Sequence, residues 1–239
     1  MQKTQDLGYE PEFNTVLIGL NKMFDALESE IERRLSQTRD ILISLNKLSN
    51  DDEYSSFLKI QKGLLFVSSY ASIEFTVTNT VASFLELISD KPNKAANYKN
   101  YILCTILHSQ FNAMRDCNKS NVWDKRAEFI DTLFSEAKIN IDSTVFPSDG
   151  INITAKQIKD IWKYFHVAGE ALPEGIADFF LMEVKNHRNA IAHGREKAAD
   201  IGGRFTLEKL DEKSKDVEKF CRYIIQSFKD LYINDGHLK

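Results

Sequence analysis

Apolar residues recur every three or four positions along most of the chain, which is the spacing of amphipathic α-helices. The first such segment spans Glu12 to Leu48, and after the polar run Ser49-Asn50-Asp51-Asp52 a second one reaches about Ser89. Between Leu64 and Val81 this second segment is apolar on nearly every side. We therefore predict two long helices, the second of them a buried central helix.

The rest of the chain predicts five shorter or later helices. We expect them at about residues 98–115, 122–138, 154–167, 174–193 and 206–233. For the 174–193 helix, Pro173 stands where a first-turn proline belongs and Gly194 marks the C-terminal stop. Thr154 can cap the 154–167 helix. Residues 139–153 are the predicted irregular loop, and Gly202-Gly203 a turn. The pattern thus predicts an all-α fold, a helical bundle of about six to seven helices.

Composition agrees with a helical protein. Only four prolines and ten glycines interrupt 239 residues, which is too little punctuation for an all-β fold. Hydrophobic residues make up 43% of the chain, enough for a sizeable core. No repeat, low-complexity tract or linker divides the chain, so we expect one domain over residues 1–239.

The compartment can be inferred from cysteines and from apolar runs. The three cysteines, Cys104, Cys117 and Cys221, are an odd number without a CxxC pair, which favours a reducing environment and predicts neither a disulfide framework nor a zinc site. Residues 1–11 lack the apolar stretch of a signal peptide, and the longest apolar runs are too short to span a membrane. We expect a cytoplasmic protein without membrane contact.

The segment Arg188-Asn189-Ala190-Ile191-Ala192-His193 carries the strongest chemical signal. It occupies the last turns of the predicted 174–193 helix. Asn189 and His193 are four residues apart and share one helix face. Arg188 lies about 140° away from His193 on an ideal helix, but its long side chain can reach the same edge. A helix end also favours a protonated histidine.

These three side chains suit RNA cleavage by the 2′-hydroxyl. The imidazole of His193 can move a proton to or from the attacking or leaving oxygen. The guanidinium of Arg188 can bind the phosphate and stabilise charge on its oxygens. Asn189 can orient His193 or a phosphate oxygen. The chemistry needs no cofactor or metal. A purely structural interpretation stays open, in which His193 only satisfies helix-end carbonyls and Arg188 pairs with Glu183.

The same segment resembles the RNxxxH signature of the HEPN superfamily of helical nucleases and nucleotide-binding domains. The run Tyr70-Ala71-Ser72-Ile73-Glu74 is similar to an early helix of that family, where an aromatic residue and a glutamate recur. The helix from Thr206 is similar to the one that follows the signature. The branch that the chain most resembles is the MAE-like and RiboL-PSP-like HEPN proteins of bacterial defence and toxin loci.

The resemblance implies a single HEPN-like domain with Arg188 and His193 as the catalytic pair and Asn189 as the accompanying polar residue. It implies a metal-independent endoribonuclease, a toxin or anti-phage defence effector. The expected partners are an RNA substrate, a second copy in a homodimer with a shared cleft, and an antitoxin or other defence-system protein. The alternatives are a catalytically inactive HEPN module that binds nucleotide or a partner protein, and a plain helical scaffold.

Glu74 and Tyr70 are candidate supporting residues. A carboxylate within an apolar stretch needs a partner, so Glu74 either supports the motif or is a satisfied structural carboxylate. Tyr70, one turn earlier, is more typical of a core residue.

Basic residues gather around the motif, although the whole chain has a net charge of −4. Five positive side chains stand against three acidic ones, Glu183, Glu196 and Asp200, a local charge of +2. They are Lys185, Arg188, Arg195, Lys197 and Arg204. Such a patch can receive phosphate, although charges around a loop are usually just solvated.

The remaining rings near the motif are predicted to be structural. His187 falls on the apolar face of its helix and is interpreted as a packing histidine. The rings at Phe179, Phe180 and Phe205 are expected in the core rather than stacked on bases. The histidines outside this region receive no role: His108, His166 and His237.

Overall fold

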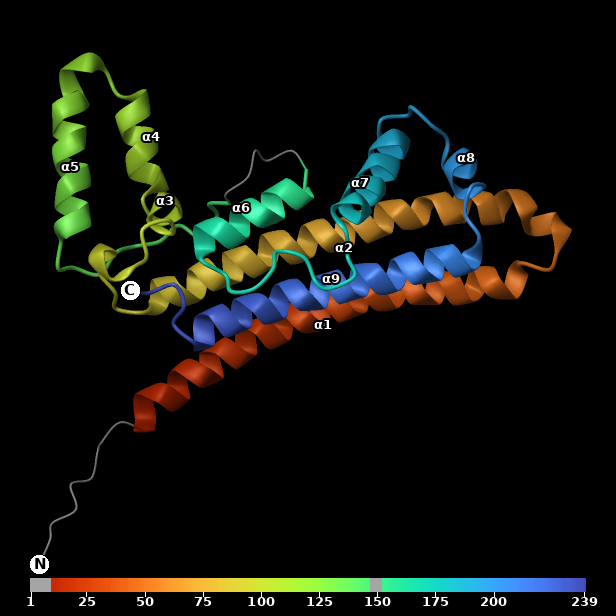
Figure 1. Cartoon of the computed structure of the whole chain (residues 1–239), viewed down its shortest axis with the longest axis horizontal. Helices are drawn as coiled ribbons and strands as arrows, with labels where there is room; N and C mark the ends of the chain where they lie inside the picture. The colour runs from red at the N-terminus through yellow and green to blue at the C-terminus, as the bar shows by residue number, and fades with distance from the viewer. Residues whose placement is uncertain (1–9, 147–151) are drawn as a thin grey trace, which may run out of the picture.

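Three long helices run side by side and form the body of the protein (Figure 1). The computed structural model describes residues 10–146 and 152–239, with side chains from Met23 onward. The three helices are α1 (Glu10–Leu48), α2 (Ser55–Asp90) and α9 (Leu207–Ile233). The described residues form helices, turns and one isolated β-bridge, which confirms the all-α prediction.

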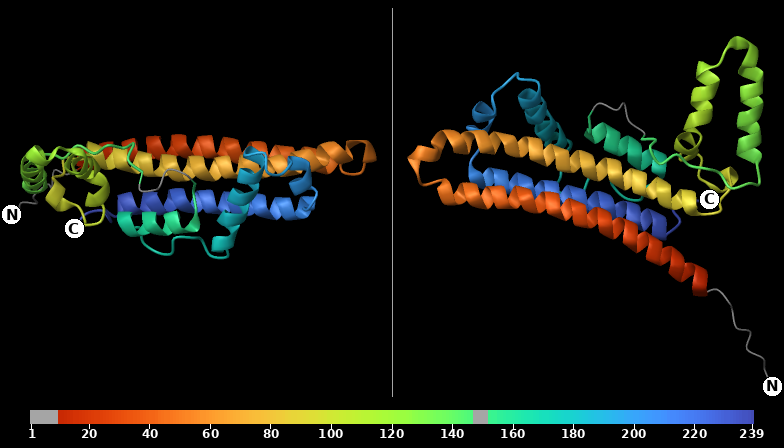
Figure 2. Two further views of the ribbon diagram at one scale, coloured as in Figure 1. Left: turned by 90° about the horizontal axis from the view of Figure 1, so that it is seen from above. Right: turned by 180° about the vertical axis from the view of Figure 1, so that it is seen from behind.

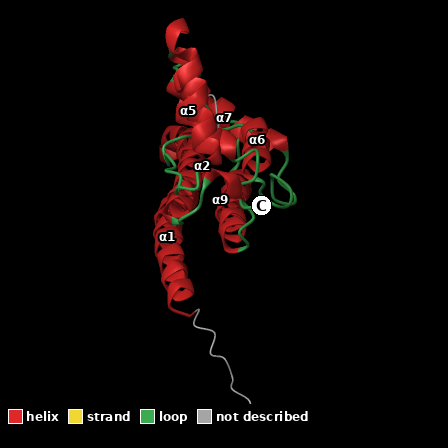
Figure 3. Ribbon diagram, turned by 90° about the vertical axis from the view of Figure 1, so that its left-hand side faces the viewer, coloured by secondary structure: helices red, strands yellow, loops and turns green. Residues whose placement is uncertain are grey.

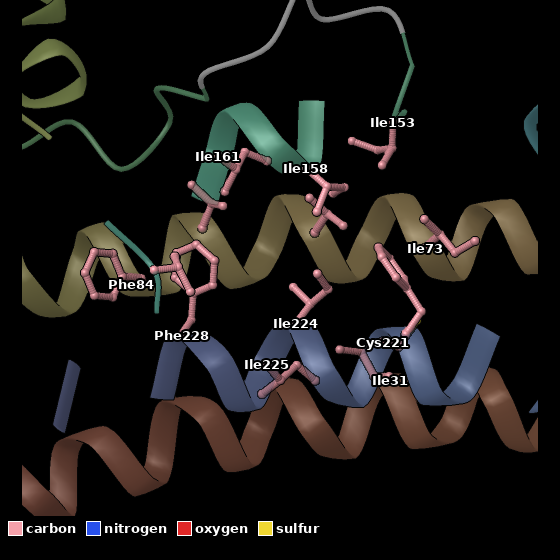
Figure 4. Packing of buried hydrophobic residues seen from close by; sticks show 14 of the residues in the cluster. Ile31, Ile73, Phe84, Ile153, Ile158, Ile161, Cys221, Ile224, Ile225 and Phe228 are labelled. Carbon is pink, nitrogen blue, oxygen red and sulfur yellow. The ribbon is translucent and has the colours of Figure 1, made fainter. Parts of the chain in front are cut away.

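The core lies where α1, α2 and α9 meet. Ile31 of α1, Ile73 of α2 and Ile224 of α9 belong to one cluster of buried hydrophobic residues (Figure 4). The prediction that α2 is the central helix is confirmed, because it packs against α1, α7, α8 and α9. This helix is not buried on every side, because Leu64 is 39% exposed.

Helix α6 (Ala155–Phe165) covers the opposite side of the α2–α9 pair from α1 (Figures 2 and 3). Its start is confirmed, since Thr154 and Gln157 form a reciprocal capping box that satisfies two backbone N–H groups. The rings of Phe84, Phe165 and Phe228 meet edge to face beneath it, with centroids 5.4–5.8 Å apart. This aromatic cluster holds α6 on the long helices.

A hairpin of α3 (Leu103–Ile106), α4 (His108–Asp116) and α5 (Val122–Phe134) projects from one end of the body (Figures 1 and 2). The predicted 98–115 helix is therefore wrong in its first part. Tyr98 is extended and bridged to Leu238, a long-range pairing that local periodicity does not reveal. The predicted 122–138 helix ends early, because Ser135 turns extended and its hydroxyl accepts the N–H of Ala137.

Two shorter helices, α7 (Asp178–Ala192) and α8 (Ala198–Gly202), pack on the N-terminal half of α2. The predicted start of α7 at residue 174 is wrong, because Gly175 adopts φ +80 and the chain turns there before the helix begins. Gly202-Gly203 was expected to be a simple turn, but Gly202 belongs to α8. A Cβ at Gly202 would lie 1.9 Å from the carbonyl oxygen of Lys59, so only glycine permits this backbone contact.

The number of helices agrees with the predicted six to seven. Seven helices of the described residues have nine or more residues, and the short helices α3 and α8 are additional. The described parts of the predicted 139–153 loop are not helical, and Pro147, Asp149 and Gly150 of that loop lie outside the described residues. Within the described ranges, no helix combines the length and the apolar content needed to span a membrane.

The last residues of the chain pack into the body rather than forming a loose tail. The N–H of Lys99 donates to the carbonyl of His237 at 3.0 Å. The ring of His237 is fully buried, with its centroid 5.5 Å from Phe84 and about 6 Å from Tyr98 and Tyr232. Burial lowers the pKa of His237 from 6.5 to about 4.

We expect this histidine to make the fold acid-sensitive. Between pH 6.5 and 4 the unfolded chain binds a proton that the folded chain excludes, so stability is lost as the pH falls through that window. The loss is about 3 kcal/mol on the scale of the shift. Urea unfolding at pH 7 and pH 4.5 should show a smaller loss for His237→Phe than for wild type. Equal losses in the two proteins would contradict this account.

Candidate functional site

The end of α7 has a well-defined geometry at His193 and Gly194. Gly194 adopts φ +66, and its N–H donates to the carbonyl of Ile191 at 3.0 Å. The next N–H, that of Arg195, donates to the carbonyl of Ala190 at 2.8 Å. These two bonds form a Schellman motif, in which a left-handed glycine closes a helix. Gly194 therefore ends the helix as the sequence predicted, and His193 is its C-terminal cap residue.

Arg188 faces α2 rather than solvent. Its guanidinium carbon lies 4.2 Å from the ring centroid of Tyr70, a cation–π contact. Nη2 lies 3.4 Å from a carboxylate oxygen of Glu74, and Nη1 donates to Oδ1 of Asn189 at 2.7 Å. The Arg188 side chain is 23% exposed, so part of it remains open to a ligand. Three neighbours thus hold the guanidinium in one orientation.

A segment distant in sequence completes this arrangement. The hydroxyl of Tyr70 accepts the backbone N–H of Ile153 at 2.8 Å, which fixes the ring beneath Arg188. Nδ2 of Asn189 donates to Oδ1 of Asn152 at 3.2 Å. Burial raises the pKa of Tyr70, so its phenol stays neutral. Sequence reasoning missed Asn152, because no local pattern links the residues before α6 to the motif on α7.

Glu74 is half-exposed and contacts Arg188, which is the geometry that a supporting role requires. The alternative in which Arg188 pairs with Glu183 is wrong, because Arg188 contacts Glu74 while Glu183 forms an ion pair with Lys213. A partly exposed pair such as Glu74–Arg188 contributes little to stability. Its effect on the site is to orient the guanidinium.

The structure separates the two residues of the predicted catalytic pair. His193 is exposed, and its ring makes no hydrogen bond to any described residue. Arg188 contacts α2 and Asn189 but not His193. On a helix that turns about 100° per residue, His193 instead shares a face with Phe179, Met182 and Asn186. One chain therefore presents His193 and Arg188 in different surroundings.

The basic patch is partly neutralised. Arg204 forms an ion pair with Glu196, whereas Arg195 and Lys197 are exposed and Lys185 is half-buried. None of these last three has an acidic partner among the described residues. Of the predicted phosphate ligands, Arg195 and Lys197 are thus the most available.

Two lysines of α2 extend this region. Lys62 donates to the carbonyl of Phe205, and Lys59 lies next to Gly203. Burial, together with the charge of Lys59, lowers the pKa of Lys62. Sequence reasoning missed both lysines, since they lie more than 120 positions before the patch. They reach it only because α8 packs against α2.

The aromatic rings near the motif pack as predicted, except at one position. His187 packs between Phe66 and Phe205, with centroids 4.7 and 5.4 Å away, and burial lowers the pKa of His187. Its interpretation as a packing histidine is confirmed. Phe180 is buried and Phe205 packs against the core, but Phe179 is 60% exposed, so its assignment to the core is wrong. The helix starts later than predicted, and Phe179 falls in its open first turn.

In the part of the chain that the structure describes, no three His, Cys, Asp or Glu side chains are arranged to hold a metal ion. The candidate site is thus an arginine, an amide and an exposed helix-end histidine on a helical bundle.

Comparison with known protein families identifies the family to which the chain belongs. Residues 29–230 match the RiboL-PSP-HEPN family, so the chain belongs to this family of HEPN domains. The match covers α2 and the motif helix in full, the second half of α1 and most of α9. Neither a curated protein nor a solved structure matches the chain. Family membership supports an RNA-related, nuclease-like module.

The support beneath Arg188 can be tested through Tyr70. Tyr70→Phe keeps the ring under the guanidinium but leaves the buried N–H of Ile153 without its acceptor. We expect a loss of about 1–3 kcal/mol in the free energy of unfolding, measured in urea. Tyr54→Phe, at an exposed tyrosine without a side-chain hydrogen bond to described residues, should change stability little. Equal effects of the two substitutions would show that the Tyr70 bond does not matter.

Proposed function

We propose that the protein is a metal-independent endoribonuclease that uses Arg188, Asn189 and His193. The observation that carries the proposal is the orientation of Arg188 together with the exposure of His193. Arg188 is oriented by Tyr70, Glu74 and Asn189, while His193 stands exposed at a closed helix end. Membership of the RiboL-PSP-HEPN family supports an RNA substrate for this site.

The proposed reaction is an internal transfer within RNA. The 2′-oxygen attacks the adjacent phosphorus, and the bond from phosphorus to the 5′-oxygen of the next nucleotide breaks. The 2′-hydroxyl gives its proton to a base, and the leaving 5′-oxygen takes a proton from an acid. The imidazoles of two copies of His193, one from each of two chains, serve these two roles. The guanidinium of Arg188 binds the phosphate and stabilises the charge that develops on its free oxygens.

A second copy of the chain would supply what one chain lacks. One chain offers a single His193, whereas the reaction needs a base and an acid. The face of α7 that carries His193 also carries Phe179 and Met182, which are 60% and 45% exposed. A two-fold axis across this face would bury both apolar side chains and bring two copies of His193 toward one cleft. It would also place two basic patches side by side, which helps a chain of net charge −4 to hold RNA.

The biological role that fits best is a toxin or anti-phage defence effector, with an antitoxin or another defence-system protein as its partner. The second candidate is an inactive module that binds nucleotide or a partner protein. The contacts of Arg188 favour this second candidate in one respect. They already use part of the hydrogen-bonding capacity of the guanidinium. An inactive module would also need such contacts for stability.

Cleavage of total RNA in EDTA separates these two functions. We expect wild type to leave 2′,3′-cyclic phosphate and 5′-hydroxyl ends. Arg188→Ala and His193→Ala should each lower the rate about 100-fold or more, because each removes a group that acts in the transition state. His108→Ala, at an exposed histidine on α4, is the matched control and should keep the activity.

The same variants extend the test to cells. Expression of wild type should slow growth, and both motif substitutions should relieve it. Products with 5′-phosphates, or wild type and motif variants that cleave equally, would rule out the proposed chemistry.

The shared cleft predicts a dimer. Light scattering should give about twice the chain mass of 27.4 kDa. Phe179→Asp combined with Met182→Asp should return the mass to that of one chain, because charge replaces apolar contact. The control is Trp123→Asp combined with Ile130→Asp on α5, where the side chains are 74% and 48% exposed. An excess of His193→Ala chain should depress wild-type activity, and an unaffected rate would refute the shared cleft.

A further inference from the structure

A second cluster of cations and aromatic rings lies far from the motif. It occupies a cleft of about 440 Å³ whose described lining residues include no acidic side chain. Figure 1 shows its surroundings, α3 and the C-terminus, at the opposite end of α6 from α7. The lining residues are Lys99, Asn100, Tyr101, His166 and Lys239. The proposed RNA-cleaving function uses none of them.

The aromatic part of the cluster is built around Tyr101. Its ring stacks on the imidazole of His166, with centroids 5.4 Å apart and planes 13° from parallel. Tyr164 packs edge-on against it with a centroid distance of 6.3 Å. Even with these contacts Tyr101 remains 47% exposed. An exposed tyrosine backed by other rings offers a planar apolar surface of the kind on which nucleic-acid bases stack.

Positive charge surrounds this surface. The ammonium of Lys163 lies 5.6 Å from the ring centroid of Tyr101 and 5.5 Å from that of Tyr164, and it has no acidic partner among the described residues. Lys99 and Lys239 line the cleft itself. Burial and the charge of Lys99 lower the pKa of His166, so the imidazole stays neutral and leaves the positive charge to the lysines.

The walls of the cleft are fixed before any ligand binds. The N–H of Lys239 donates to the carbonyl of Asn97 at 2.9 Å, and Lys99 Nζ donates to the carbonyl of Gly236 at 2.6 Å. His166 ends α6 in a left-handed conformation at φ 56, with its N–H bonded to the carbonyl of Trp162. A conformation that L residues rarely adopt turns the chain so that the imidazole meets Tyr101. Segments from three parts of the sequence thus form one preorganised surface.

We propose that this cleft binds one nucleotide unit, with the base on Tyr101 and the phosphate among Lys99, Lys163 and Lys239. A purely anionic ligand would need the lysines but not the exposed ring, and a purely apolar ligand would not need the lysines. A nucleotide uses both, and Asn100 adds amide donors and acceptors for a base edge. The unit can belong to a free nucleotide or to a single-stranded RNA, which have the same base and phosphate chemistry.

The experiment uses the full chain with His193→Ala, so that cleavage does not consume the probe. Calorimetry with uridine 5′-monophosphate and anisotropy with a short labelled oligouridylate measure binding. Tyr101→Ala combined with Lys163→Ala should weaken binding about 10-fold or more, as expected for the loss of one stacked base and one phosphate contact. The matched control is Trp123→Ala combined with Lys119→Ala, an exposed ring and an exposed lysine of the α4–α5 hairpin.

Each outcome has a defined meaning. Binding of the mononucleotide at this cleft assigns a free nucleotide, and binding of the oligonucleotide alone assigns a strand of RNA. Equal affinity of the two double variants for both probes would overturn the proposal. So would polyglutamate or inorganic phosphate that binds as tightly as the nucleotide. The readout is binding by a chain that lacks His193, so failure here leaves the proposed cleavage by Arg188 and His193 to its own test.

Discussion

The apolar length of α2 must be covered on most of its sides, and the other elements are arranged to do so. Helices α1 and α9 pack along it, and α7 and α8 pack on its N-terminal half. The contact with α8 is so close that Gly63 and Gly202 have no room for a Cβ. Because burial of apolar surface is the dominant favourable term in folding, this requirement determines where the motif helix lies.

The position of α7 against α2 has a chemical consequence. It places Arg188 over Tyr70 and beside Glu74, two α2 residues on the edge of the buried face. The helix end that carries His193 projects beyond this contact into solvent. One interface therefore orients the arginine but leaves the histidine free. The proposed cleft between two chains rests on this division, since the open face of α7 also carries Phe179 and Met182.

At the end of the molecule that carries α3, the structure depends on pairing between segments distant in sequence. There the last residues return to pair with residues 97–99, and His237 becomes buried among aromatic rings. The same return brings Lys239 beside Tyr101 and His166. The pairing thus stabilises the fold and shapes a basic, aromatic cleft. The two regions present different side chains, with Arg188, Asn189 and His193 in one and a basic, aromatic cleft in the other.

Local patterns predicted the elements whose cause is local. The 3.6-residue periodicity located α1, α2 and α9, Thr154 as a cap located the start of α6, and Gly194 located the end of α7. The motif itself is contiguous, so its residues could be read directly from the sequence. Interactions between distant segments were beyond such patterns. They determined the extended Tyr98, the Asn152 contact to Asn189, and the lysines of α2 beside α8.

The sequence by itself determined the helical class and the chemical groups of the motif, because periodicity, caps and side-chain types are properties of neighbouring residues. Only the tertiary structure decided that Arg188 lies on Tyr70 while His193 faces solvent. The reason is that a helix presents its side chains in all directions, and the packing partner selects which of them are buried.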